Sequence, residues 1–280
     1  MESARLECVW QLPGVRAGSG LAWWGGRLLV VQDDAMSVVL VDPVTRETST
    51  MALAPGGGAL SKAEKPDFEA VLTLPDGALQ LFGSGSTPRR RLIARLDPQT
   101  GVWTLIEASA FYAALEHAIG GPPNVEGAVV VGEALRLLHR GAGGSPNMVL
   151  EVPFSPANVP EPRVSAAWRV DLGCLGGVPL TFTDGVSLSD GRLLYLAVAE
   201  DTPNAVDDGP VVGLAVGVWT PGAPARWAPV RDPDGAMSTR KAEGLVLAPD
   251  GRSAYIITDP DDPERPAELG RLMLDGATYV

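Results

Sequence analysis

The chain has 280 residues, of which 45% are hydrophobic and 20% are charged, and its net charge is −12. This length and apolar content are enough for a sizeable core, and repeat folds of this size often form one unit, so we expect residues 1–280 to form a single domain. The acidic balance argues against nucleic acid and anionic membrane surfaces as partners, since both are polyanions.

The sequence also predicts a cytoplasmic protein. It has no apolar run long enough to cross a membrane, and residues 1–7 lack the basic start and apolar stretch of a signal peptide. The two cysteines, Cys8 and Cys174, lie far apart and in no metal-binding spacing,. This pattern favours buried free thiols in a reducing compartment.

The first strand pattern covers residues 6–12, and a repeated pattern begins after it. In each repeat an acidic residue opens an apolar strand, and in three repeats this strand ends in an Asp-Gly turn, which is a strong hairpin signal,. The acids are spaced 57, 58 and 59 residues apart, at Glu69, Glu126, Asp184 and Glu243. A repeat before them, at residues 18–26, has Ser19 or Gly20 where the acid is expected.

Further strand patterns follow each opening strand, such as residues 78–82, 91–96 and 101–106. Four antiparallel strands in each repeat of about 50 residues are typical of β-propeller blades. The sequence therefore predicts an all-β fold, a single five-bladed β-propeller with four-stranded antiparallel blades. The last repeat has no room for a fourth strand, so strand 6–12 is expected to join it and close the ring. A ring with six blades is the alternative.

Three segments depart from the repeat. Residues 109–118 are rich in helix formers and predict a short helix that opens on Ser109 as its cap and ends near Gly120,. Residues 153–162 and 221–233 are rich in proline and are expected to be loops,.

In a propeller, the opening strand of each blade lines the channel and the second strand returns to the same face. The four acids and the residues that end the second strands should therefore meet at one rim. Asp33, His139 and Asp259 end second strands, Arg140 follows His139, and Lys241 precedes Glu243.

Carboxylates that share a channel repel one another, so they must take up protons or hold a cation. A hard cation with oxygen ligands suits them, and calcium accepts six to eight oxygens. The predicted calcium ligands are Glu69, Asn124, Glu126, Asp184 and Glu243. Two other interpretations stay open: the acids accept backbone N–H bonds between blades, or they act as catalytic carboxylates without a metal.

The remaining candidates surround these acids. Arg140 and Lys241 are expected to orient an anionic group, and the candidate general bases are Asp33, His139 and Asp259. The stretch Gly83–Arg91 combines a Gly/Ser turn with three arginines at the same rim, which fits either an anion-binding turn or a plain surface hairpin,.

At Asn124-Val125-Glu126-Gly127, Thr183-Asp184-Gly185 and Lys241-Ala242-Glu243-Gly244 the sequence resembles bacterial propellers of the phytase-like esterase kind. It is more distantly similar to the gluconolactonase and paraoxonase group, and most similar to an uncharacterised bacterial subgroup marked by the Gly83–Ser86 stretch. The resemblance implies calcium held by acids and asparagine at the channel mouth. The first repeat departs from it by lacking an acid, and the histidine pair of paraoxonase-like chemistry has no equivalent.

Together these patterns predict a calcium-dependent hydrolase that acts on a small anionic ester, lactone or phosphoester at the channel mouth. One alternative is a non-catalytic propeller that binds a small ligand or a protein partner on the same face. The second alternative is a glycosidase, in which two carboxylates act across a sugar.

Overall fold

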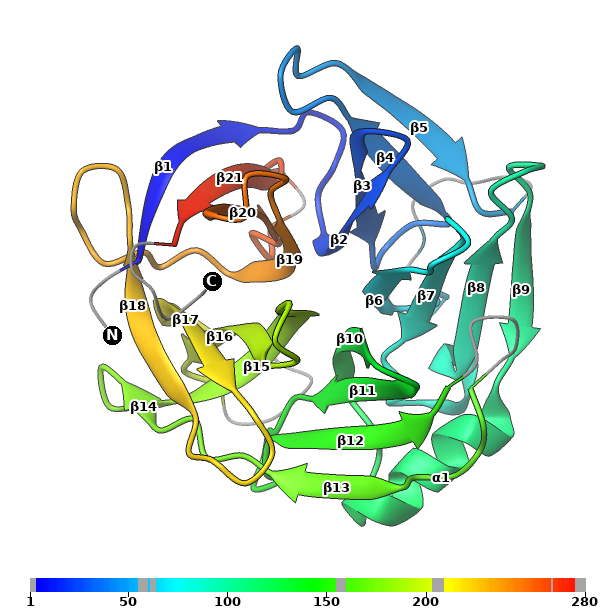
Figure 1. The fold of residues 1–280 in the computed structure, drawn as a ribbon. Coiled ribbons are helices and arrows are strands. Elements are labelled where there is room, and N and C mark those ends of the chain that lie inside the picture. The colour runs from blue at the N-terminus through cyan, green and yellow to red at the C-terminus, as the bar shows by residue number, and fades with distance from the viewer. Residues whose placement is uncertain are drawn as a thin grey trace.

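The structure, a computed structural model, describes residues 4–54, 60, 64–154, 160–202, 209–262 and 264–274. Over these residues the chain is nearly all β, as the sequence predicts (Figure 1). Three sheets each have four antiparallel strands that pair in chain order. They are β2 (Gly18–Trp24), β3 (Arg27–Gln32), β4 (Ser37–Val41) and β5 (Thr48–Ala52); β6 (Phe68–Thr73), β7 (Leu79–Gly83), β8 (Leu92–Leu96) and β9 (Trp103–Glu107); and β10 (Val125–Val131), β11 (Ala134–His139), β12 (Met148–Pro153) and β13 (Ala166–Arg169).

A fourth sheet contains nine strands and consists of two four-stranded antiparallel sets and one short extra strand. The first set has β15 (Val178–Ser187), β16 (Leu193–Glu200), β17 (Val211–Trp219) and β18 (Arg226–Arg231), and β14 (Cys174–Leu175) pairs with β15. The second set has β19 (Ala242–Leu247), β20 (Ser253–Thr258), β21 (Glu268–Met273) and β1 (Ala4–Gln11).

The N-terminal strand completes the last set, as the sequence predicts. β1 pairs antiparallel with β21 from Arg5 to Gln11. Its other neighbour is β18, with which it forms only two parallel pairs, Ala4 with Val230 and Arg5 with Arg231. The two ends of the described chain therefore lie in one sheet, and β1 links the two sets of the nine-stranded sheet.

The opening strands of the five sets contact one another in order: β2 with β6, β6 with β10, β10 with β15, β15 with β19, and β19 with β2. Figure 1 shows the sets placed around a common centre, with these strands innermost. The arrangement is consistent with a propeller, and it brings the five opening strands together.

The core lies between neighbouring sets. Leu29 and Val31 of β3, for example, pack in one cluster with Leu79 and Leu81 of β7. A middle strand of a set packs against a neighbouring set on each of its two faces, so both of its faces are apolar. This explains why β16 is buried at every position,. Tryptophans also pack there, as Trp23 does edge-on against Tyr255,.

The predicted helix is present as α1 (Ser109–Ile119), and it ends at Gly120, whose φ of 81° is the left-handed conformation that glycine adopts at low cost,. The expected Ser109 cap is wrong, because Ser109 is the first helical residue and Ala108 holds the cap position without a side-chain bond. The Tyr112 hydroxyl donates to the Gly83 carbonyl at 2.7 Å, which ties the helix to the end of β7.

The expected loop at residues 221–233 is wrong, because β18 runs through it. Prolines flank the strand and one lies inside it, Pro229, which pairs with Ala215. An outer strand tolerates a missing N–H better than a central one. The high proline content of residues 221–233 therefore wrongly indicated a loop. In the expected loop at 153–162, Pro153 belongs to β12, and residues 155–159 lie outside the described part.

The expectation of buried thiols is also wrong. Cys174 is exposed in the β14–β15 hairpin and Cys8 is half-buried in β1, and both are free. Within the described residues, no helix has the length and apolar character needed to cross a membrane.

The role of β1 can be tested with Leu6→Ala. Leu6 is fully buried in the core cluster that β1 shares with β16 and β20. We expect its truncation to lower the free energy of unfolding by about 2–5 kcal/mol, as is usual for a buried leucine. Urea unfolding followed by tryptophan fluorescence measures the change. Leu105→Ala on β9, where the side chain is 41% exposed, is the control, and an equal loss in both variants would contradict the assignment of β1 to the core.

Candidate functional site

Each of the five opening strands has a β-bulge, at the second residue in four of them and at the sixth in β15. The bulged residue has no partner on the second strand, because the pairing skips one position. A bulge of this kind re-aims a side chain and is frequent beside functional sites. The five bulged residues are all buried, and they are Ser19, Glu69, Glu126, Thr183 and Glu243.

The spacing that aligned Asp184 with the other acids is wrong by one residue. Thr183 occupies the bulge, and Asp184 follows it at the position that Gly127 holds in β10. One carboxylate oxygen of Asp184 accepts the Gly185 N–H at 2.7 Å, and the other accepts the Leu245 N–H of β19 at 2.6 Å. Asp184 therefore joins two neighbouring strands, which is the stapling role that the sequence left open.

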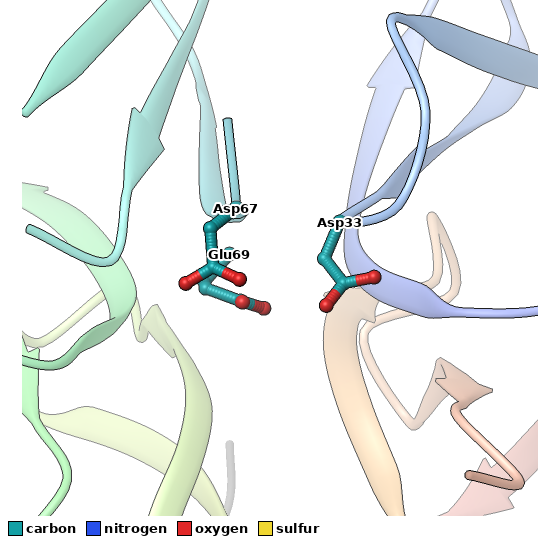
Figure 2. A group of neighbouring side chains, drawn as sticks. All are labelled: Asp33, Asp67 and Glu69. Carbon is teal, nitrogen blue, oxygen red and sulfur yellow. The ribbon is translucent and has the colours of Figure 1, made fainter. Parts of the chain in front are cut away.

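Three carboxylates converge between the first two sets. Asp33 follows β3, Asp67 precedes β6 and Glu69 lies in β6, and each offers an oxygen within 4.8 Å of the others (Figure 2). The Glu69 side chain is only 9% exposed, and among the described residues none forms a side-chain hydrogen bond or ion pair with it. One oxygen of Asp33 is also buried without a hydrogen-bond partner. We call these residues the acidic cluster.

Sequence reasoning missed Asp67. Its position two residues before Glu69 was the available signal, since alternate residues of a strand share a face. Its backbone φ of 57° and the bulge after it could not be read from the sequence.

Two cations and a serine contact the acidic cluster. The Lys65 ammonium pairs with Asp33 and, at 3.0 Å, with Asp67. The Arg90 guanidinium lies 2.8 Å from the other oxygen of Asp67, to which the Ser84 hydroxyl donates. The Gly83–Arg91 stretch therefore does reach the rim, where Arg90 serves a carboxylate of the same chain.

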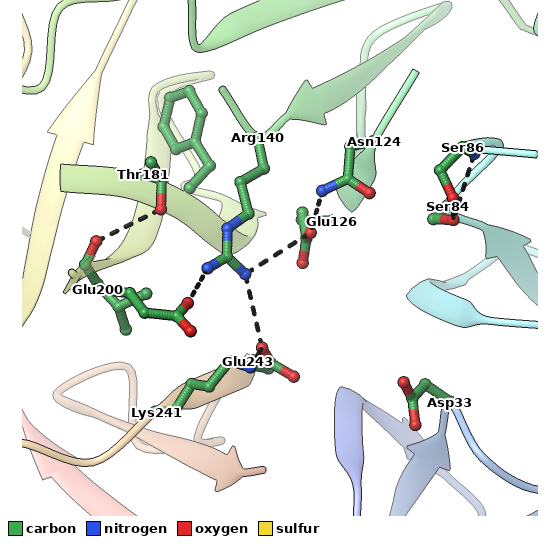
Figure 3. A network of polar contacts seen from close by, with 12 residues as sticks. Asp33, Ser84, Ser86, Asn124, Glu126, Arg140, Thr181, Glu200, Lys241 and Glu243 are labelled. Atoms are coloured by element: carbon green, nitrogen blue, oxygen red, sulfur yellow. Dashed lines mark hydrogen bonds and ion pairs between the residues drawn. The ribbon is translucent and has the colours of Figure 1, made fainter. Parts of the chain in front are cut away.

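A second group lies across the centre from the acidic cluster, around Arg140 (Figure 3). The Arg140 guanidinium pairs with Glu200 and lies 3.8 Å from Glu126 and 3.7 Å from Glu243. The Asn124 side-chain amide donates to Glu126 at 2.7 Å. Glu200 ends β16, the second strand of its set, so its place at the rim follows the same rule that predicted Asp33 and Asp259.

Lys241 extends this group toward the outside. Its ammonium lies 3.4 Å from Glu243 and 2.7 Å from Asp261. One carboxylate oxygen of Asp259 accepts the Asp261 N–H at 2.8 Å. Both Lys241 and Asp259 line a cleft of about 480 Å³ between the last two sets, together with Val211, Arg240, Asp261 and Arg265.

His139 has a supporting position. It is 2% exposed, its Nδ1 accepts the Asn124 N–H at 3.0 Å, and its Nε2 lies 3.2 Å from the Ser145 hydroxyl. Burial lowers its pKa to about 4, so the ring is neutral near pH 7,. Both ring nitrogens are thus engaged, and His139 holds the Asn124 backbone; its role as a general base stays a prediction.

The buried acids have raised pKa values. Burial, reinforced by neighbouring carboxylates, raises the pKa of Glu69 well above its ordinary value. Burial also raises the pKa of Glu126 to about 8, against the opposing effect of Arg140, and that of Asp259 to about 8. Burial opposes the charge on Lys65, but Asp33, Asp67 and Glu69 outweigh it and raise the pKa of its ammonium. The centre therefore holds more carboxylates than its cations neutralise, and some carry protons at neutral pH.

Fold and site together define a propeller-like protein with a buried acidic centre. The chain belongs to the family of unknown function DUF6929, whose model matches residues 14–274. Among curated proteins, none matches this chain.

Solved structures share its fold at low sequence identity. Regucalcin from Agrobacterium tumefaciens, described as a calcium-binding protein, has a TM-score of 0.50 at 10% identity over 96% of this chain and 95% of that one. A luciferin-regenerating enzyme has a TM-score of 0.52 at 10% identity over 98% and 97%. An α-L-arabinofuranosidase from Podospora anserina has a TM-score of 0.53 at 13% identity over 98% and 96%. These likenesses show the fold alone.

The stapling role of Asp184 predicts a loss of stability in Asp184→Asn. The amide would turn a donor toward one of the two backbone N–H groups that the carboxylate now accepts. We expect a loss of about 1–3 kcal/mol, the cost of a buried unsatisfied donor. Asp190→Asn, at an exposed turn after the same strand, should change the free energy of unfolding by less than about 0.5 kcal/mol. Equal values in urea unfolding would disprove the staple.

The raised pKa values predict that stability falls as pH rises from about 5 to about 8. Glu126 and Asp259 stay protonated up to about pH 8 when folded but ionise at their lower ordinary pKa when unfolded. The folded chain therefore binds more protons in this window, and each group lowers the free energy of unfolding by at most about 1.4 kcal/mol per pH unit. Urea unfolding at pH 5.5, 7 and 8.5 without added divalent ions measures the slope. Glu126→Gln should flatten it, and a stability that rises with pH would contradict the expectation.

Proposed function

We propose that this protein is a hydrolase that acts on a small ester or lactone at the mouth of a closed five-bladed propeller. The proposed blades are the five four-stranded sets, with the nine-stranded sheet dividing between β18 and β1. Two observations support this count: β18 and β1 share only two pairs, and the opening strands of the first and last sets contact each other.

The observation that carries the functional proposal is the state of Glu69. Its side chain is buried beside Asp33 and Asp67, yet no described residue gives it a hydrogen bond or an ion pair. A buried carboxylate without a partner is costly, so its retention is explained best by a ligand that supplies the missing positive charge.

The donor set suits calcium. Carboxylate oxygens are the hard ligands that this ion prefers. One oxygen of Asp33 is buried without a hydrogen-bond partner, and Glu69 offers an oxygen within 4.8 Å of it. We propose Asp33, Asp67 and Glu69 as its ligands. The neighbouring carboxyl groups of Glu126 and Glu243 would add negative charge around the ion when they ionise. When bound, calcium would supply Lewis acidity to a substrate carbonyl and to water.

The other residues at the channel mouth would transfer protons and hold the carboxylates of the site in place. Asp259, with a pKa of about 8 and a place in the cleft, would take a proton from attacking water and return it to the leaving alkoxide. Arg140 and Lys241 hold Glu243 from two sides. Because acids already pair with both cations, the site suits an uncharged carbonyl better than the anionic phosphoester that the sequence also allowed.

The free cysteines favour a cytoplasmic location. Cys174 is exposed and neither thiol forms a disulfide, which fits a reducing compartment. We therefore keep the cytoplasm as the proposed location.

A panel of small lactones and esters tests the proposal with and without calcium. We expect hydrolysis that requires the ion, a rate that rises with pH up to about 8, and a melting temperature that calcium raises. Glu69→Gln should lower kcat/KM by at least about ten-fold, in line with the loss of a metal-site contact, and should weaken the calcium effect on melting.

Glu133→Gln is the matched control, since this exposed glutamate follows the opening strand of the next set. Its activity and melting should equal those of the unchanged protein. If calcium alters neither melting nor hydrolysis, the metal-dependent mechanism is wrong. If the protein binds lactones without turning them over, the non-catalytic alternative replaces the hydrolase, and hydrolysis of aryl glycosides instead would favour the glycosidase.

A further inference from the structure

Lys65 lies inside the acidic cluster rather than at its edge. Its side chain is 14% exposed, and its ammonium contacts Asp33 from the first set and Asp67 from the second. The lysine precedes Asp67 by two residues, so it belongs to the same segment that delivers Asp67 and Glu69 to the centre. A single side chain thus joins two of the three carboxylates that a cation would use.

The contacts of Lys65 overlap with those of a bound cation. The three carboxylates offer oxygens within 4.8 Å of one another, and the ammonium pairs with two of these residues. Asp33 keeps one oxygen without a partner, and Glu69 has none of its contacts filled by a described residue. Since two positive charges in contact with the same carboxylates repel each other, a divalent ion that uses all three residues must move the ammonium away.

The other cations of the mouth do not compete in this way. Lys241 forms ion pairs with Glu243 and Asp261, and Arg140 forms them with Glu126, Glu200 and Glu243. Arg90 contacts Asp67 alone in the acidic cluster, on the oxygen opposite to the one that Lys65 uses. Among the ion pairs of the described residues, those of Lys65 are the ones that bridge two members of the cluster.

We propose that Lys65 is a tethered counter-ion that competes with a divalent cation for Asp33, Asp67 and Glu69 and so sets the affinity of this cluster for the ion. The inference rests on the cation site of the proposed function. With the ammonium in place, the cluster is partly neutralised. With the ion bound, the flexible lysine side chain lies outside the cluster, and Glu69 gains its missing partner. The free energy needed to displace the Lys65 ammonium then weakens the affinity of the cluster for calcium.

The test is the calcium affinity of three proteins, measured by titration calorimetry with calcium chloride alone. In Lys65→Met the competitor is absent, so the dissociation constant should fall by about ten- to a hundred-fold, the gain when a state populated at about 1–10% becomes the only state. Lys241→Met is the matched control, because it removes one buried positive charge from the same mouth without touching the cluster. It should change the constant by less than about three-fold, through distant charge alone.

A double variant locates the bound ion. Glu69→Gln in the Lys65→Met background should remove most of the gain in affinity, because it takes a ligand from the cluster. If the gain persists, the ion binds elsewhere and the proposal is wrong.

A measurement on the unchanged protein guards against a Lys65→Met variant that fails to fold. The sequence has three lysines, Lys62, Lys65 and Lys241. Calcium should increase acetylation of Lys65 relative to Lys241 in a timed reaction read by mass spectrometry, since expulsion exposes its amine. Sodium chloride at equal ionic strength should not. Unchanged Lys65 labelling at calcium concentrations that saturate the protein would overturn the proposal.

The outcomes separate this inference from the proposed function. Equal calcium affinity in the unchanged protein and in Lys65→Met disproves the competition but leaves the cation site intact. Equal tightening in Lys65→Met and Lys241→Met also disproves it, because general charge then explains the effect. Absence of calcium binding in all variants overturns both the competition and the metal-dependent part of the proposed function.

Discussion

The balance between buried carboxylates and tethered cations is the constraint on which the centre of this protein depends. The five opening strands meet at the centre, and the bulges of three of them bring glutamates there, joined by Asp33 and Asp67. Such a density of negative charge away from water is unfavourable unless protons or cations accompany it. Lys65, Arg90, Arg140 and Lys241 supply part of the compensation. The negative charge that these four side chains do not neutralise is the physical basis for a bound cation or for protons at the site.

The two halves of the centre use their cations differently. Arg140 lies among three glutamates and leaves each with a partner. In the acidic cluster, by contrast, Glu69 stays without a partner although Lys65 and Arg90 lie nearby. One half is thus a closed ion-pair network that orders the strand ends, and the other has unused ligand capacity. This asymmetry is the reason for proposing Glu69, and not the glutamates around Arg140, as a ligand of a cation.

Bulges explain why regular spacing located the acids but misassigned one of them. A strand side chain changes face with every residue, so an offset of one position decides whether a carboxylate faces the centre or the next strand. Glu69, Glu126 and Glu243 occupy the bulges, whereas Asp184 follows one and accepts N–H groups of Gly185 and Leu245. In β15 the bulge holds Thr183, an uncharged residue that the search for repeated acids could not identify.

The sequence by itself determined the all-β class, the four-stranded repeat, a helix over residues 109–118 and the pairing of the N-terminal strand with the last repeat. These follow from local periodicity, turn residues and the length of the last repeat, which are properties of short stretches. Only the tertiary structure decided that Asp67 joins Asp33 and Glu69, that His139 supports Asn124, and that Lys65 lies within the acidic cluster. Such contacts depend on bulges and on distances between strands far apart in the chain, and no local pattern encodes them.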